Sequence, residues 1–229
     1  MTSPFPSLGL SLAIVCSLAV TAPVGAADDD EGARFEVTIT NLTRGQQFTP
    51  ILVASHKSDV KLFELGKPAS TELATLAEEG NPAPLAAALL ALPGTGQVVT
   101  GSGLTNPGAS TTLNVEGRRG FGFLSVAAML IPTNDGFFAL NRVALPRGND
   151  SLTLTAPAYD AGSERNDELC VSIPGPFFAE CGGSGGGAKV GGGEGYVHIH
   201  AGIHGIGNFS AAVRDWRNPV ALITVRRVR

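Results

Sequence analysis

Short stretches of alternating apolar and polar residues, separated by turns rich in Gly, Pro and Asn, constrain the fold of this chain most. In the first, Phe35, Val37 and Ile39 alternate with polar neighbours, the period of a half-buried strand. Further β segments lie at residues 97–100, 111–115, 121–131, 137–143, 151–155, 196–200 and 220–228. Many short strands that do not alternate with helices predict an all-β antiparallel sandwich and argue against a doubly wound α/β fold.

One stretch, residues 68–93, has a helical pattern instead. Ser70 is suited to cap a helix in which Leu73 and Leu76 share one face, and Pro84 is suited to open a second helix rich in Ala and Leu. We therefore predict two short helices inserted between strands. The second helix has no basic face, so its apolar residues favour packing on the core over lying on a membrane surface.

The N-terminus has the layout of an export signal. Residues 8–20 are apolar, Pro23 interrupts them, and small residues follow. We predict a signal peptide at residues 1–27, although no Lys or Arg precedes the apolar run. That run is short for the roughly 20 residues that cross a bilayer, which argues against an uncleaved anchor. The mature protein is then secreted or periplasmic, with no membrane span.

The rest of the chain reads as one domain. The acidic residues at 28–33 predict a disordered leader, residues 34–229 the folded domain, and the glycines at 182–195 a mobile loop. The net charge is −4, and no long basic run occurs, so we expect no nucleic-acid partner.

The mature chain keeps two cysteines, Cys170 and Cys181. An even pair in an exported chain predicts a disulfide, which would fix the start of the glycine-rich loop. Two unpaired thiols, or a pair that binds a metal, are the alternatives.

Acidic residues in two loops are the first candidates for a functional site. Asp135 and Asp160 each follow a predicted strand. Carboxylates gathered at one end of a sandwich repel each other unless a cation lies among them, and Ca²⁺ takes oxygen ligands of this kind. The alternative is that both residues are turn residues that accept hydrogen bonds from their own backbone.

The sequence around these two acids resembles the spondin N-terminal domain family. The resemblance is carried by residues 130–137 (LIPTNDGF), 159–164 (YDAGSE) and 217–221 (RNPVA), with support from 41–43 and 48–50. Members are extracellular β-sandwiches similar to C2 domains, and those of animal matrix proteins bind calcium through three acidic residues. The resemblance implies Asp135, Asp160 and Glu164 as calcium ligands here. Animal members carry Asp where this chain has Glu164, and Asp167 is the nearest substitute.

The resemblance also implies a binding role. Animal members act in adhesion and in matrix or receptor binding, and this chain, without their partner modules, is most similar to the stand-alone bacterial branch. We expect an exported binding or adhesion module in which Ca²⁺ orders the loops at one end for an extracellular or envelope protein or glycan. The chain has no GxSxG motif, and we do not expect an enzyme.

A run of histidines is the second candidate site. His198, His200 and His204 lie within seven residues, and the chain has four histidines in all. Imidazole nitrogens suit Zn²⁺ or Cu²⁺, so the alternative function is a metal-binding protein or a metalloenzyme built on these three side chains. Hydrogen bonding of the rings to a neighbouring loop is the structural interpretation. No HExxH motif is present, and the animal members lack this run.

Overall fold

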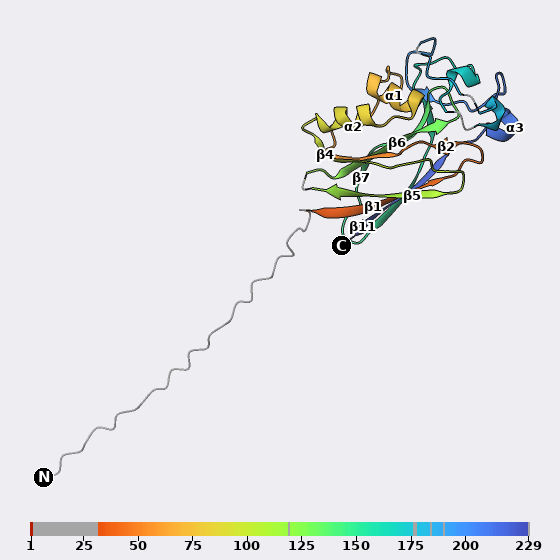
Figure 1. The fold of residues 1–229 in the computed structure, drawn as a ribbon. Helices are drawn as coiled ribbons and strands as arrows, with labels where there is room; N and C mark the ends of the chain where they lie inside the picture. The colour runs from red at the N-terminus through yellow and green to blue at the C-terminus, as the bar shows by residue number, and fades with distance from the viewer. Residues whose placement is uncertain (2–31, 119, 176–177, 184, 190, 229) are drawn as a thin grey trace.

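The computed structural model describes residues 1, 32–118, 120–175, 178–183, 185–189 and 191–228. Figure 1 shows two layers of strands with helices on one side. In chain order the elements are β1 (Ala33–Asn41), β2 (Gln47–Phe48), β3 (Leu52–His56), α1 (Thr71–Glu79), α2 (Ala83–Leu90), β4 (Thr95–Thr100), β5 (Ser110–Gly117), β6 (Phe123–Ile131), β7 (Gly136–Ala144), β8 (Ser151–Ala156), β9 (Ala158–Asp160), the 3₁₀ turns η1 (Cys170–Ser172) and η2 (Ala179–Cys181), β10 (His198–Ile199), α3 (Ala211–Arg214) and β11 (Ala221–Val228).

The strands form two antiparallel sheets. One sheet has the order β5-β1-β11-β8, and the other has the order β10-β9-β7-β6-β3-β4, with β2 paired to β6. β1 shows the predicted alternation, since Phe35, Val37 and Ile39 are buried between the sheets and the residues between them are more exposed. The all-β sandwich expected from the sequence is confirmed.

The helical insertion covers the outer face of the second sheet (Figure 1). The sequence predicted two helices between strands, and they lie between β3 and β4, where the Ser70 side chain accepts a hydrogen bond from the Leu73 N–H at the start of α1. Leu73 and Leu76 are fully buried in a cluster that includes Leu52 of β3 and Phe137 of β7. This sheet is therefore buried on both faces.

Three strands of this sheet, β2, β3 and β9, have no counterpart in the sequence analysis, and β2 has only two residues. In β3 all five residues are buried, because one face packs on the first sheet and the other on the helices. A strand buried on both sides does not alternate, so it lacks the period-2 signal. β9 is only three residues long, which is too short to show a period.

The predicted disulfide is confirmed. Cys170 in η1 and Cys181 in η2 are bonded, with their Cα atoms 5.6 Å apart. The glycine-rich segment is held beside this bond, because the Gly186 N–H donates to the Cys170 carbonyl at 2.7 Å.

The predicted signal peptide, and all but the last two residues of the predicted leader, lie outside the described residues. β1 begins at Ala33, the last residue that the sequence assigned to the leader. Among the helices of the described residues, none is both long and apolar enough to cross a membrane.

Candidate metal site

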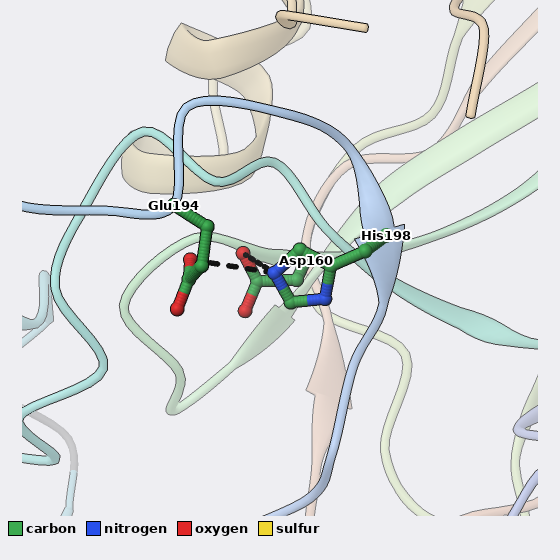
Figure 2. Close-up of side chains that lie close together, drawn as sticks. All are labelled: Asp160, Glu194 and His198. Carbon is green, nitrogen blue, oxygen red and sulfur yellow. Dashed lines mark ion pairs between the residues drawn. The ribbon is translucent and has the colours of Figure 1, made fainter. Parts of the chain in front are cut away.

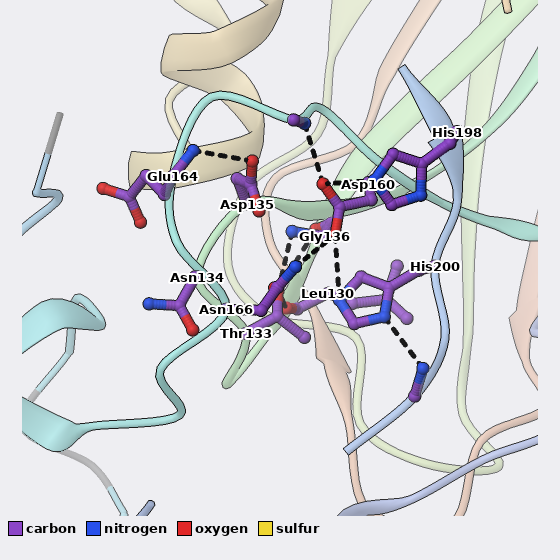
Figure 3. Close-up of polar contacts among 12 residues, drawn as sticks. Leu130, Thr133, Asn134, Asp135, Gly136, Asp160, Glu164, Asn166, His198 and His200 are labelled. Atoms are coloured by element: carbon purple, nitrogen blue, oxygen red, sulfur yellow. Dashed lines mark hydrogen bonds and ion pairs between the residues drawn. The ribbon is translucent and has the colours of Figure 1, made fainter. Parts of the chain in front are cut away.

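Strand pairing brings the two predicted acids together. In the pairing of β7 with β9, Gly136 lies opposite Asp160. Asp135 directly precedes Gly136, and its carbonyl accepts the Ala161 N–H at 3.1 Å. Two loops that are distant in the sequence therefore meet at one end of the second sheet, as Figure 3 shows for their side chains.

Asp135 is held through one oxygen only. Its Oδ2 accepts the backbone N–H groups of Ser163 at 2.7 Å and Glu164 at 3.0 Å, and also the Ser163 hydroxyl at 3.1 Å. Its Oδ1 has no hydrogen-bond partner, and the residue is 0% exposed. The Asx-turn alternative does not describe Asp135, because the donors to Oδ2 come from Ser163 and Glu164 in the other loop, and it leaves the buried Oδ1 unexplained.

Asp160 lies at the centre of the site. Its Oδ1 accepts the Gly162 N–H and its Oδ2 accepts the Asn166 side-chain amide, each at 2.7 Å. Gly162 has φ +67°, and a Cβ there would lie 2.3 Å from the Tyr196 carbonyl oxygen, so glycine is required at this turn. On the side of Asp160 away from β7, β10 pairs with β9 and sets His198 opposite Asp160.

Glu164 contributes a buried carboxylate whose two oxygens both lack a hydrogen-bond partner. In Figure 3 this carboxylate points away from Asp160. The strongest charge acting on it is that of Glu78, a buried residue of α1 that the sequence analysis did not single out. The sequence around Glu78 contains no pattern that predicts its place beside Glu164. That place depends on how α1 packs on the second sheet.

Burial and mutual repulsion raise the pKa values of these carboxyl groups. Burial, with the charge of Asp160, raises the pKa of Asp135 to about 6. Burial, with the charges of Glu78 and Asp135, raises the pKa of Glu164 to about 8. Burial also raises the pKa of Glu78 and of Asp160. All four carboxylates are less stable in their charged form here than in water.

Asp167, the predicted substitute ligand, is fully engaged elsewhere. Its Oδ1 accepts from the Asn134 amide and the Leu169 N–H, and its Oδ2 accepts from the Ser172 hydroxyl. Although burial alone would raise it, these hydrogen bonds lower the pKa of Asp167. Its geometry is that of a turn residue stabilised by neutral donors.

The three histidines have separate surroundings. His204 is exposed, whereas His200 is buried with its ring 4.9 Å from that of Trp216. His198 is half-buried, and its Nε2 lies 3.6 Å from Asp160 Oδ1 and 3.3 Å from Glu194 Oε2 (Figure 2). Among the described residues, Asp160, Glu194 and His198 are the group of potential metal ligands whose ligand atoms all lie within 4.8 Å of one another.

The acidic loops have the donor set of a hard cation. Three buried carboxylate oxygens, Oδ1 of Asp135 and both of Glu164, have no partner at hydrogen-bond geometry, and such groups are costly to bury. The Lys189 backbone N–H offsets part of that cost at Glu164, where it lowers a pKa that burial raises. The carboxylate of Asp135 feels the charge of Asp160, and that of Glu164 feels the charge of Asp135, and carboxylate oxygens are ligands that Ca²⁺ takes. The chemistry of these residues fits the cation that the family resemblance implies, but among the described residues the ligand atoms of Asp135, Asp160 and Glu164 do not all lie within 4.8 Å of one another.

The comparison with protein families agrees with this geometry. The family model described as Spondin_N matches residues 39–167, more than half of the chain. The chain belongs to the spondin N-terminal domain family. The match includes Asp135, Asp160 and Glu164, whereas Glu194 and His198 lie beyond it. A comparison with curated proteins found no match.

Membership in the spondin N-terminal domain family indicates an extracellular, adhesion-type module. The disulfide between Cys170 and Cys181 is consistent with that setting, because such bonds persist in oxidising compartments.

Proposed function

We propose that this spondin N-terminal domain is an exported binding or adhesion module whose acidic loops hold Ca²⁺. Asp135 and Asp160 are the central ligands, and Glu164 is the third. The observation that carries the proposal is the Asp135 carboxylate, which is completely buried beside Asp160 with one oxygen free of any donor.

The ion would act on the loops through charge. A divalent cation offsets the burial and the mutual repulsion that raise the pKa values of Asp135 and Glu164. It would thereby fix the loop after β6 against the loop after β9. The glycine-rich segment joins the same unit, because Gly191 donates from its N–H to the Ser163 carbonyl at 3.1 Å.

The fixed loops would offer a surface to a partner. Glu194 and Tyr196 are exposed beside the buried acids, and Ca²⁺ commonly keeps coordination positions for oxygen atoms from outside the protein. An extracellular or envelope protein or a glycan supplies such oxygens. Secretion or export to the periplasm places the domain where calcium is available.

Thermal unfolding of Asp135→Asn tests the proposal. We expect Ca²⁺ to raise the Tm of the wild-type protein and to leave the Tm of Asp135→Asn unchanged. In chelator, the variant should be at least as stable as the wild type, since it loses a buried charge while its side-chain carbonyl still accepts hydrogen bonds. The exposed Asp150→Asn is the matched control and should respond to Ca²⁺ as the wild type does.

Two results would contradict the calcium site. One is a wild-type Tm that is the same in Ca²⁺ and in chelator. The other is an Asp135→Asn variant that loses stability in chelator yet keeps the full calcium response, which would make Asp135 a turn residue only.

A further inference from the structure

The His198 ring has a fixed tautomer. Its Nδ1 lies 3.0 Å from the Ile199 carbonyl oxygen. A carbonyl oxygen only accepts hydrogen bonds, so Nδ1 carries the ring proton and Nε2 of the neutral ring has a free lone pair. Histidines that bind metals are commonly oriented in this way, with the other ring nitrogen donating to a backbone carbonyl.

The free nitrogen of His198 faces two carboxylates. Glu194 Oε2 lies 3.3 Å from it and Asp160 Oδ1 lies 3.6 Å from it (Figure 2). His198 Nε2 is buried and has no hydrogen-bond partner. With the ring neutral, three electron-pair donors therefore converge on one point. Ligands of a tetrahedral ion with bonds of about 2.1 Å are about 3.4 Å apart, close to both separations.

A second histidine is aimed at the same carboxylate. His200 is 6% exposed, and its Nε2 has no hydrogen-bond partner although it lies 4.0 Å from Asp160 Oδ2. Its Nδ1 accepts the Gly202 N–H at 3.0 Å, so the proton of the neutral ring is on Nε2. With that proton in place, His200 has no lone pair facing Asp160 and is not a ligand.

Glycine residues allow Glu194 to reach this point. The Gly195 N–H donates to the Gly162 carbonyl at 2.8 Å, and a Cβ on Gly193 would lie only 2.5 Å from the same carbonyl oxygen. The side chains of Glu194 and His198 are 41% and 27% exposed. The glycine-rich segment thus places a carboxylate over Asp160 and leaves one side open to solvent.

We propose that Asp160, Glu194 and His198 bind a first-row divalent metal ion, for which Zn²⁺ is the probe. An imidazole nitrogen with two carboxylates favours such an ion over Ca²⁺, which takes oxygen ligands. The site shares Asp160 with the proposed calcium site but does not depend on calcium binding. It replaces the trio of histidines expected from the sequence with one histidine and two acids.

Zinc titration of the tag-free, chelator-treated protein tests the proposal, with the bound metal measured by elemental analysis. We expect stoichiometric Zn²⁺ in the presence of excess Ca²⁺. His198→Gln and Glu194→Gln should each weaken Zn²⁺ binding by about tenfold or more. Exposed His204→Gln is the matched control and should bind Zn²⁺ as the wild type does. Because Glu194 is half exposed, its variant should fold even if His198→Gln does not.

Asp135→Asn separates the two metal proposals. It should lose the calcium response and keep Zn²⁺ binding. The zinc site is refuted if the wild type takes up no Zn²⁺, if Glu194→Gln binds it as tightly as the wild type, or if His204→Gln abolishes binding. The zinc site is also refuted if Ca²⁺ displaces Zn²⁺ and Asp135→Asn abolishes the binding of both ions. Zinc would then only occupy the calcium site. A proton shared among the three side chains would account for a result without zinc.

Discussion

Glu168 fixes the backbone of residues 204–206 through its carboxylate. The residue is 3% exposed and has a left-handed φ of 55°. Its Oε1 accepts the His204 N–H at 2.5 Å, and its Oε2 accepts the N–H groups of Gly205 at 2.8 Å and Ile206 at 3.0 Å. One buried carboxylate therefore shapes the loop that follows the histidine run.

We expect Glu168→Ala to lower the free energy of unfolding by about 3 kcal/mol, because hydrogen bonds to a charged group are lost and backbone donors are left without a partner. Urea unfolding measures the change, with the exposed Glu79→Ala as control. A Glu168→Ala variant within about 0.5 kcal/mol of the wild type would mean that water replaces the carboxylate at no cost.

At the residue scale, the sequence predicted only those site residues that a local sequence motif identifies. Asp135 and Asp160 stand in short acidic turns after strands, and the family resemblance singled them out. Glu78 and Glu194 have no such local pattern, because a helix and a glycine-rich segment bring them to the site from elsewhere in the chain. The spacing of the histidines pointed to a metal site, but it could not fix their ring tautomers, which depend on tertiary contacts.

At the element scale, the disulfide joins the two 3₁₀ turns that precede the glycine-rich segment. We expect the double variant Cys170→Ser, Cys181→Ser to have a free energy of unfolding about 3 kcal/mol below that of the wild type, the loop-closure value for so short a loop. Urea unfolding of the double variant, beside the wild type with and without reductant, measures the effect. Equal stability in all three samples would show that η1 and η2 hold the segment without the bond.

Strands and helices with one exposed face were predictable from their period, and β6 was predicted although it is buried along nearly all of its length. β1, β5 and β8 show alternating burial, and the two helices begin at a serine cap and near a proline. β3 was not predictable in this way, because the helices cover the face that would otherwise carry polar residues. The helical insertion could therefore be predicted from the sequence, but β3, which the helices cover, could not.

At the scale of the whole molecule, the raised pKa values predict how stability varies with pH. The folded pKa values of Asp135, about 6, and Glu164, about 8, lie above the ordinary values of 3.8 and 4.5. The folded protein then binds more protons than the unfolded chain, so in chelator its stability falls as the pH rises from about 4 to about 8.

Calcium should reverse this trend, because the ion competes with those protons. With the Asp135 pKa at about 6 and the Glu164 pKa at about 8, we expect Ca²⁺ affinity to rise by at least about tenfold between about pH 5 and about pH 7. Calorimetric titrations at several pH values measure it. An affinity that does not change with pH would show that these carboxylates are already ionised in the folded protein without calcium.

Calorimetric titration of Ca²⁺ into the chelator-treated protein at neutral pH tests the central claim most directly. Our account predicts a saturable, stoichiometric heat that Asp135→Asn abolishes and Asp150→Asn retains. It is contradicted if the wild-type protein gives no binding heat up to about 10⁻³ M Ca²⁺, the weak end of the range for extracellular calcium modules.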